Sequence, residues 1–564
     1  MLLILISWCY IFITLVNFGF VATKILQFPL QNKLLHLVLG LSIILITSHI
    51  WAFFEGFGIV FHIFLLLSNV FIASVFKLEL IQFFKEIQRT LFHFSRTYQI
   101  FLLVILLLFL AKSASMGSFI DNENYYVQTI KWLNQYGFVK GLANFNLLLG
   151  QTSGWHVLQS AFSFHFLNID FNDIGGFFLF ILNVYAFKLA YRKSQSIQLL
   201  IWLPALNWFI LEFCTVPSPD FGIILFGIIL VSLFLKTYKN PTKTDAYISF
   251  ILFLSAILIK VTAIGLFIFP MVLLFKLEKK SLFFYLKNTG LLFLFALLWI
   301  GKNLVISGHP FYPSNLLSNF FELTHQVPDA LYNFSLRKDK LFEFFATTKE
   351  VKSLSILALF WRWLTYSKVS MFFNISLMLS IFVIPFLITR LKSKAKFWWV
   401  YASFVFQLIF LVFTSPQYRF AIHYLIIFCV LFLNINKIAS KYRISIFGLS
   451  QILVLFFILF PIQFSQLSSK NYTLKSSSFQ LENVVIPISN SSIQTTYKTN
   501  TIGNLKYYSA VDTFYLWVSG DGDLPCINDT QLLFTAQKTR FVPQLIDSLN
   551  LSKGFFAKKI PISN

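Results

Sequence analysis

The sequence predicts an all-α polytopic membrane protein of about 14 transmembrane helices that carries a small C-terminal α/β domain. Hydrophobic residues make up 57% of the 564 residues and charged residues only 12%, which is far too apolar for a soluble globular domain. Apolar runs of roughly 14 to 21 residues recur up to Pro461, and such a run crosses a bilayer as a helix because only a helix satisfies its own backbone there. After Pro461 the composition shifts to Ser, Asn, Thr and Lys.

The short loops between the apolar runs alternate between basic and base-poor. Residues 24–33, 77–96 and 390–396 are basic, whereas residues 55–57 and 414–419 are nearly free of base. Under the positive-inside rule the basic set is cytoplasmic. The alternation therefore predicts a protein integral to a bacterial cytoplasmic membrane, with both termini and the C-terminal domain on the outer side. The excess of 45 Lys and Arg over 22 Asp and Glu is explained by this topology rather than by nucleic-acid binding.

The apolar runs and loops fall into consecutive units. Three spans and a basic cytoplasmic linker come first, followed by a seven-span core, a second outer loop, four last spans and a soluble domain. The ranges are 1–97, 98–301 with a first outer loop at 118–173, 302–369, 370–462 and 463–564. Two apolar stretches in the outer loops are too short to cross the membrane. We expect "WHVLQSAFSFHFL" to be interfacial or re-entrant and "LSILALFWRWLTY" to lie in the interface.

The C-terminal domain is expected to contain both strands and a helix. The stretches "NVVIPIS" and "TFYLWVS" alternate as strands do, and "FVPQLIDSLNLS" is helix-like. The four cysteines of the chain show no metal-ligand spacing. Cys214 and Cys526 both fall on the predicted outer side, where they either pair or remain free thiols.

The candidate site consists of ionisable groups at the outer ends of the spans, because a charge at such a depth is costly and asks for an explanation. The stretch "SFIDNENYY" places Asp121 and Glu123 directly after the fourth span. The two side chains share a direction only if the backbone is extended, since in a helix they diverge by about 200°. The alternative is that Asp121 caps a helix that begins at Asn122. A capping carboxylate can also serve as a base, so the two interpretations are compatible.

Four more residues at the same depth carry suitable chemistry. Arg419 and His423 are four residues apart on one helical face, where a guanidinium and an imidazole suit a phosphate group. Arg419 could instead snorkel to the interface. Lys260 separates two short spans in "ILIKVTAIG", so it either reaches water in a turn or faces the bundle interior. Asp220 in "TVPSPDFG" precedes a span, where it would also fit an N-cap.

The stretch "GKNLVISGHPFYPSN" leads from a span into the second outer loop. Lys302 lies at the helix exit, and His309 and Tyr312 follow in a turn made rigid by Gly308 and two prolines. The alternative is an ordinary proline-rich loop. The chain contains no GxxxxGK[ST], no GxGxxG after a strand and no HExxH. Group transfer at the outer face would therefore use a donor other than a cytosolic nucleotide.

The order of these features resembles the GT-C superfamily of polytopic glycosyltransferases. It comprises a span, a large outer loop that opens with "DNENYY", six further spans, a second large outer loop, more spans and an outer soluble domain. The stretches "VPSPD", "GKNLVISGHPFYP" and "SPQYRF" also resemble bacterial polytopic proteins of this type. The resemblance covers about residues 98–436, and the first three spans are extra. Gln417 departs from the pattern, because an acidic residue is expected there.

The resemblance implies transfer of a sugar from a polyprenyl-phosphate donor in the membrane lipids to an envelope glycan, lipid or protein. It implies that Asp121 is the general base, with Glu123 as a second carboxylate. The departing phosphate would be stabilised by cations or imidazole, for which the candidates are Lys260, Lys302, Arg419 and His423. A single base and direct displacement would invert the anomeric centre. No cofactor is required, although Asp121 with Glu123 or Asp220 could hold a divalent metal.

Three other functions fit a chain of this kind. A lipid-linked oligosaccharide flippase would bury charge near the bilayer midplane and often shows internal repeats, neither of which we find in the sequence. An O-antigen-type polymerase or ligase would depend on Arg419, His309 and His423 and be indifferent to Asp121. A non-enzymatic assembly factor would use the C-terminal domain as its binding surface.

Overall fold

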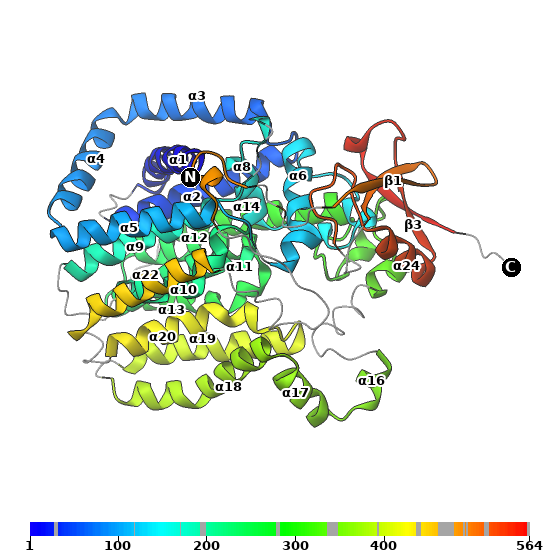
Figure 1. Cartoon of the computed structure of the whole chain (residues 1–564). Coiled ribbons are helices and arrows are strands. Elements are labelled where there is room, and N and C mark those ends of the chain that lie inside the picture. The colour runs from blue at the N-terminus through cyan, green and yellow to red at the C-terminus, as the bar shows by residue number, and fades with distance from the viewer. Residues whose placement is uncertain are drawn as a thin grey trace.

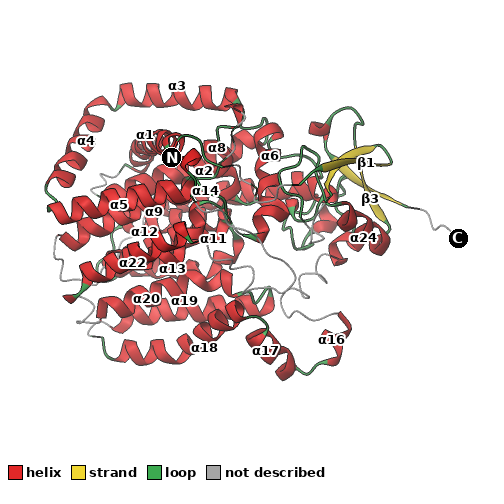
Figure 2. Ribbon diagram, in the orientation of Figure 1, coloured by secondary structure: helices red, strands yellow, loops and turns green. Residues whose placement is uncertain are grey.

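The computed structural model is a bundle of long helices with the small C-terminal domain at one end, which we call the domain end (Figures 1 and 2). The structure describes residues 1–27, 32–117, 119–167, 169, 171–191, 199–277, 282–334, 348–391, 394–435, 441–460, 479–488, 491, 495–511 and 518–560. Parts of the basic loops at 24–33 and 390–396 therefore lie outside the described residues.

Nine helices in these ranges are long and apolar enough to cross a membrane, or ten if α3 (Ile59–Val75) and α4 (Lys77–Phe92), which are bent by 91°, form one span. The nine are α1 (Leu2–Leu26), α2 (Lys33–Ala52), α5 (Arg96–Ser113), α9 (Ile174–Tyr191), α11 (Pro219–Thr237), α14 (Leu282–Ser307), α18 (Lys368–Thr389), α19 (Lys394–Phe413) and α20 (Ile422–Ile435) with the 3₁₀ turn η8 (Tyr418–Ala421) before it. The predicted helical class is confirmed, whereas the count of about 14 spans is not.

The remaining predicted spans are helical but short. They are Leu199–Cys214, made of η4 (Leu199–Leu206), α10 (Asn207–Ile210) and η5 (Leu211–Cys214); α12 (Lys243–Ile259); Val261–Lys276, made of η6 (Val261–Phe267) and α13 (Ile268–Lys276); and α22 (Arg443–Leu459). Pro204 lies inside η4, where it cannot donate a backbone hydrogen bond. Lys260 has extended backbone (φ −158°, ψ 120°) and so ends α12. These breaks divide the apolar runs into pieces.

The two long loops at the domain end contain short helices. The first has the π turn η1 (Asn122–Tyr126), α6 (Val127–Tyr136), α7 (Leu142–Phe145), η2 (Leu149–Gln151), α8 (Gly154–Phe162) and η3 (His165–Leu167), and the second has η7 (Ser318–Phe320), α16 (Thr348–Ser353) and α17 (Ile356–Thr365). All nine residues of α8 are buried, and it packs against α2, α11 and α12 rather than lying at a surface. By contrast, α17 has no buried residue and exposes Ile356 and Trp361, as expected at an interface.

The C-terminal domain contains two antiparallel hairpins and one helix. Its elements are η9 (Leu481–Val484), β1 (Tyr497–Ile502), β2 (Leu505–Ala510), α24 (Asp529–Thr539), β3 (Phe541–Leu545), η10 (Leu551–Lys553) and β4 (Phe555–Lys559). The prediction of a helix in "FVPQLIDSLNLS" is wrong, because Phe541–Leu545 pairs with β4 in the register Leu545↔Phe555. A 3₁₀ turn begins the stretch predicted as the strand "NVVIPIS". Most of "TFYLWVS" lies outside the described residues.

Several segments distant in sequence meet at the domain end. The backbone of Ile488 donates to Ala114 after α5 (3.1 Å), and that of Leu3 donates to Val485 (3.2 Å). The start of α1 and the segment that leads into the C-terminal domain therefore lie on the same side of the bundle. All four cysteines are free thiols, so Cys214 and Cys526 are not paired.

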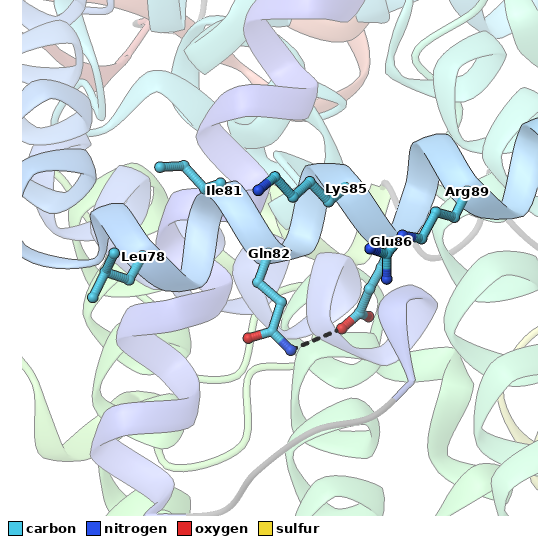
Figure 3. A pocket seen from close by; sticks show the side chains of 6 residues that line it. All are labelled: Leu78, Ile81, Gln82, Lys85, Glu86 and Arg89. Atoms are coloured by element: carbon cyan, nitrogen blue, oxygen red, sulfur yellow. Dashed lines mark hydrogen bonds between the residues drawn. The ribbon is translucent and has the colours of Figure 1, made fainter.

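At the opposite end of the bundle, α4 carries a shallow hollow of about 310 Å³ (Figures 1 and 3). Its lining residues are Leu78, Ile81, Gln82, Lys85, Glu86 and Arg89. Glu86 pairs with Lys33 at 2.8 Å, which joins α4 to the start of α2. This hollow is thus separate from the candidate site residues named in the sequence analysis.

Candidate functional site

Asp121 and Arg419 form an ion pair at the domain end of the bundle. Asp121 precedes the π turn η1, and its side chain makes no capping hydrogen bond to that turn. Its carboxylate instead accepts a hydrogen bond from Arg419 in η8, 298 positions away in the sequence. Because π turns are rare and often occur at functional sites, the local backbone also marks this position. Capping alone does not account for Asp121.

A second ion pair joins Asp220 and Lys260. Ser218, rather than Asp220, is the N-cap of α11, and Asp220 lies in the first turn of that helix. The Lys260 Nζ atom donates to Asp220 Oδ1 at 2.5 Å. The extended backbone of Lys260 at the end of α12 places the ammonium group beside α11. Lys260 thus contacts a neighbouring helix and remains partly exposed.

Both cations lie over one aromatic ring, that of Phe420. The Lys260 Nζ atom is 4.0 Å from the ring centroid and the Arg419 Cζ atom is 5.1 Å from it. The side chains of Arg419 and Lys260 are 35% and 20% exposed, and Asp121 is 20% exposed. The ring thus holds two partly accessible cations close together, each neutralised by a carboxylate. We call Asp121, Asp220, Lys260 and Arg419 the ionic cluster.

Two tyrosines and a histidine lie beside the ionic cluster. The rings of Tyr125 and Tyr126 are 4.6 Å apart, and the Tyr126 ring is 4.8 Å from that of His156 in α8. Burial raises the pKa of Tyr125 above its ordinary value, and the nearby Asp121 carboxylate raises it further. Burial lowers the pKa of His156 to about 3, and the ammonium groups of Lys302 and Lys260 add to this shift. At physiological pH all three rings are therefore neutral.

Lys302 lies near His156, at the start of α8. Its side chain extends from α14 and is buried, and its Nζ atom donates to the backbone oxygen of Thr152 at 2.6 Å. Thr152 immediately precedes Ser153, the N-cap of α8. Lys302 is thus near the ionic cluster but not part of it.

Glu123 is turned toward the C-terminal domain. Its carboxylate accepts hydrogen bonds from Asn122 (3.0 Å) and from Ser491 (2.6 Å), and the backbone of Ser519 donates to its carbonyl oxygen (3.0 Å). Gln128, on the helix that follows, donates to the carbonyl oxygens of Gly520 and Gly522. Asp121 and Glu123 therefore have different partners, as their spacing in a helix predicts.

The two predicted residues of the second loop have local bonding partners. The ring nitrogens of His309 contact Ser318 Oγ (2.6 Å) and the carbonyl oxygen of Val327 (2.8 Å). The Tyr312 hydroxyl donates to the carbonyl oxygen of Leu147 at 2.8 Å, which holds the two loops together. These contacts hold the two loops in their folded arrangement.

His423 is buried within the bundle, close to Gly227 of α11. It follows Arg419 by one helical turn, but its ring contacts that of Tyr424, with ring centroids 4.3 Å apart. The structure therefore brings Asp121, Asp220, Lys260 and Arg419 together and leaves His423 apart from them.

Sequence reasoning missed Phe420, Tyr125, Tyr126 and His156. Phe420 stands next to Arg419, and the two tyrosines follow Glu123 directly, so their proximity to the site could have been inferred. His156 could not be found in this way, because it reaches the site only through the burial of α8. Within the described residues, no group of three or more His, Cys, Asp or Glu side chains could hold a metal ion. Asp121 and Asp220 are each engaged by a cation instead, so we derive no metal-dependent step.

Comparison with known proteins gives one match. A family model described as a domain of unknown function, DUF8201, matches residues 1–426. The chain belongs to this family. The DUF8201 match includes the first three spans and the whole ionic cluster, and it ends within α20, before the C-terminal domain. No curated protein and no solved structure matches the chain.

Proposed function

We propose that this protein is an integral membrane glycosyltransferase of the GT-C type. It transfers a sugar from a polyprenyl-phosphate donor to an envelope glycan, lipid or protein on the outer face of a bacterial cytoplasmic membrane. The domain end, with both termini, faces outward. The observation that carries the proposal is the ionic cluster, in which two carboxylates and two cations meet over the Phe420 ring.

The two cations suit the phosphate of the donor. Arg419 offers a planar fork of donors and Lys260 a compact charge, and both are partly accessible. The phosphate would compete with Asp121 and Asp220 for these cations and so release a carboxylate for chemistry. An aromatic wall reduces the local dielectric and strengthens such charge interactions.

Asp121 is the proposed general base. It takes the proton from an acceptor hydroxyl while the acceptor oxygen bonds to the anomeric carbon. The bond from that carbon to the phosphate oxygen breaks, and its electron pair leaves with the polyprenyl phosphate, whose charge Arg419 and Lys260 stabilise. A single displacement inverts the anomeric centre.

The geometry gives less support to the other functions. A polymerase or ligase that used His309 and His423 would need them near Arg419, but His309 is engaged by Ser318 and Val327, and His423 packs near α11. A flippase would need charges along the bundle. The ionic cluster instead lies at the domain end.

Replacing Asp121 with Asn tests the proposal directly. The amide keeps the size of the side chain but cannot accept the proton, so Asp121→Asn should abolish transfer in a protein that still inserts and folds. Mass spectrometry of envelope glycans should show loss of the product, and lipid-linked sugars should accumulate.

Glu86→Gln is the matched control. Glu86 is also a carboxylate paired with a lysine, but it lies at the other end of the bundle, so this variant should make normal amounts of product. If cells that carry Asp121→Asn also make wild-type amounts, the glycosyltransferase proposal with this base is wrong.

A further inference from the structure

One face of α8 presents buried polar groups that have no protein partner. His156, Gln159 and Ser160 are spaced i, i+3 and i+4, which places them on the same face of the helix. Each is at most 2% exposed. Within the described part of the chain, His156 Nε2, both amide atoms of Gln159 and Ser160 Oγ lack hydrogen-bond partners. Buried polar atoms are nearly always satisfied, so such a group of atoms points to a polar ligand.

The helix cap determines which nitrogen of His156 carries the proton. The backbone N–H of Ser153 donates to His156 Nδ1 at 3.3 Å, and Ser153 Oγ accepts from the backbone of Trp155 and His156. Since Nδ1 accepts a hydrogen bond and the ring is neutral, the proton is on Nε2. The α8 face therefore contains a buried N–H donor beside an amide and a hydroxyl, which is a suitable set for sugar hydroxyl groups.

Lys302 is a buried lysine without a paired carboxylate among the described residues. It is 5% exposed. Its hydrogen bond to Thr152 places the ammonium at the N-terminal end of α8, where the helix dipole is also positive. A buried ammonium is costly unless an anion pairs with it. The site thus favours one negative group.

This second site adjoins the ionic cluster. Lys302 and Lys260 both act electrostatically on His156. His156 is therefore near both lysines, and its contact with Tyr126 joins it to the residues around Asp121. A donor whose phosphate binds Arg419 and Lys260 would extend its sugar toward His156.

We propose that Lys302 and the α8 face bind the sugar of the donor and that this sugar is acidic. Its carboxylate pairs with Lys302, and its hydroxyl groups bond to His156, Gln159 and Ser160. This inference rests on the proposed function. A second phosphate fits less well, because the groups beside Lys302 on the α8 face are neutral hydrogen-bonding side chains.

Binding of three lipids to the full-length protein in nanodiscs tests this inference. The probes are polyprenyl-phosphate glucose, polyprenyl-phosphate glucuronate and polyprenyl-pyrophosphate glucose. The first two differ only in the carboxylate at C6. Wild-type protein should bind the glucuronate lipid at least about tenfold more tightly than either glucose lipid, as expected for a partly desolvated charge pair.

Substitutions at Lys302 and Gln159 test whether this site causes the preference for the glucuronate lipid. Lys302→Met should abolish the preference for glucuronate, and Lys302→Arg should retain most of it. Gln159→Met should weaken binding of both monophosphate lipids without loss of thermal stability, because it removes an amide that has no protein partner. The matched control is Gln407→Met. It should lose thermal stability but keep the preference, since Gln407 bonds to Gly265 and Thr262.

The outcomes separate the two proposals. Equal binding of the glucose and glucuronate monophosphate lipids, or a preference for the pyrophosphate lipid, overturns the acidic-sugar inference. So does a glucuronate preference that survives in Lys302→Met. If sugar transfer still depends on Asp121 in these cases, the proposed function stands. If none of the three lipids binds, both proposals fail.

Discussion

Each carboxylate of the ionic cluster is held by a cation, and the neighbouring rings are neutral. The structure therefore places the Asp121 carboxylate beside a guanidinium in a partly buried position. The neutral form of His156 also matters, because its protonation would add a positive charge near Lys260 and Lys302. Local protonation states thus determine the charge balance of the site.

Titration of His156 should make stability depend on pH. Burial lowers the pKa of the folded-state ring to about 3, whereas an unfolded histidine has a pKa of about 6.5. Between these values the unfolded state binds one more proton, so stability falls as pH decreases below 6.5, by up to about 1.4 kcal/mol per pH unit. The free energy of unfolding of wild type and of His156→Gln, measured in detergent from pH 7 to pH 5, tests this contribution of His156. It should fall more steeply with decreasing pH in wild type than in the variant. Parallel pH profiles would contradict it.

At the scale of elements, the helix that follows Asp121 connects the site to the C-terminal domain. Beyond the Glu123 and Gln128 bonds, Lys131 of α6 pairs with Asp521 at 2.9 Å. Phe555 of β4 stacks on Phe145 of α7, with ring centroids 5.1 Å apart. The domain is therefore docked on the first loop by polar and aromatic contacts.

Glu123→Gln should loosen this docking. The uncharged amide accepts the Ser491 hydrogen bond less strongly than the carboxylate does. We expect limited proteolysis to release the C-terminal domain several-fold faster than in wild type. Glu482→Gln, an identical change at an exposed glutamate in the same region, should have no effect. Equal cleavage rates for the two variants would show that Glu123 does not secure the domain.

The sequence predicts elements better than contacts. Apolar runs were sufficient to identify the helices, because each helix satisfies its own backbone. They did not indicate that the run around Pro204 is broken, whereas Lys260 was predicted to separate two short spans. Phe541–Leu545 was interpreted as helix because its apolar spacing fits both periods, and only pairing with β4 decides between them. Short segments therefore depend on tertiary partners that no local pattern reveals.

At the scale of the whole molecule, the site is assembled from distant parts of the chain. The sequence selected Asp121, Asp220, Lys260 and Arg419 from their common depth, but the pairing of Asp121 with Arg419 spans 298 positions and has no local signal. Burial of α8 brings in His156 in the same way. Position near one end of the bundle can be predicted from sequence, whereas partner choice requires the packed bundle.

The arrangement of the molecule also predicts which regions face each side of the membrane. In a variant with all four native cysteines replaced by Ser, Lys498→Cys in β1 should react with a membrane-impermeant maleimide in spheroplasts. Lys85→Cys in α4 should react only after permeabilisation, because α4 lies at the opposite end of the bundle (Figure 1). The reverse labelling pattern would place the ionic cluster in the cytoplasm and contradict the proposed use of a donor on the outer face.

The continuous helical stretch from η1 through α6 has a mechanical consequence. Asp121 stands at its beginning, and the bonds of Gln128 and Lys131 to the C-terminal domain come two to three turns later. A displacement of the C-terminal domain would therefore be transmitted along this helix to the Asp121 backbone and would change the distance between Asp121 and Arg419.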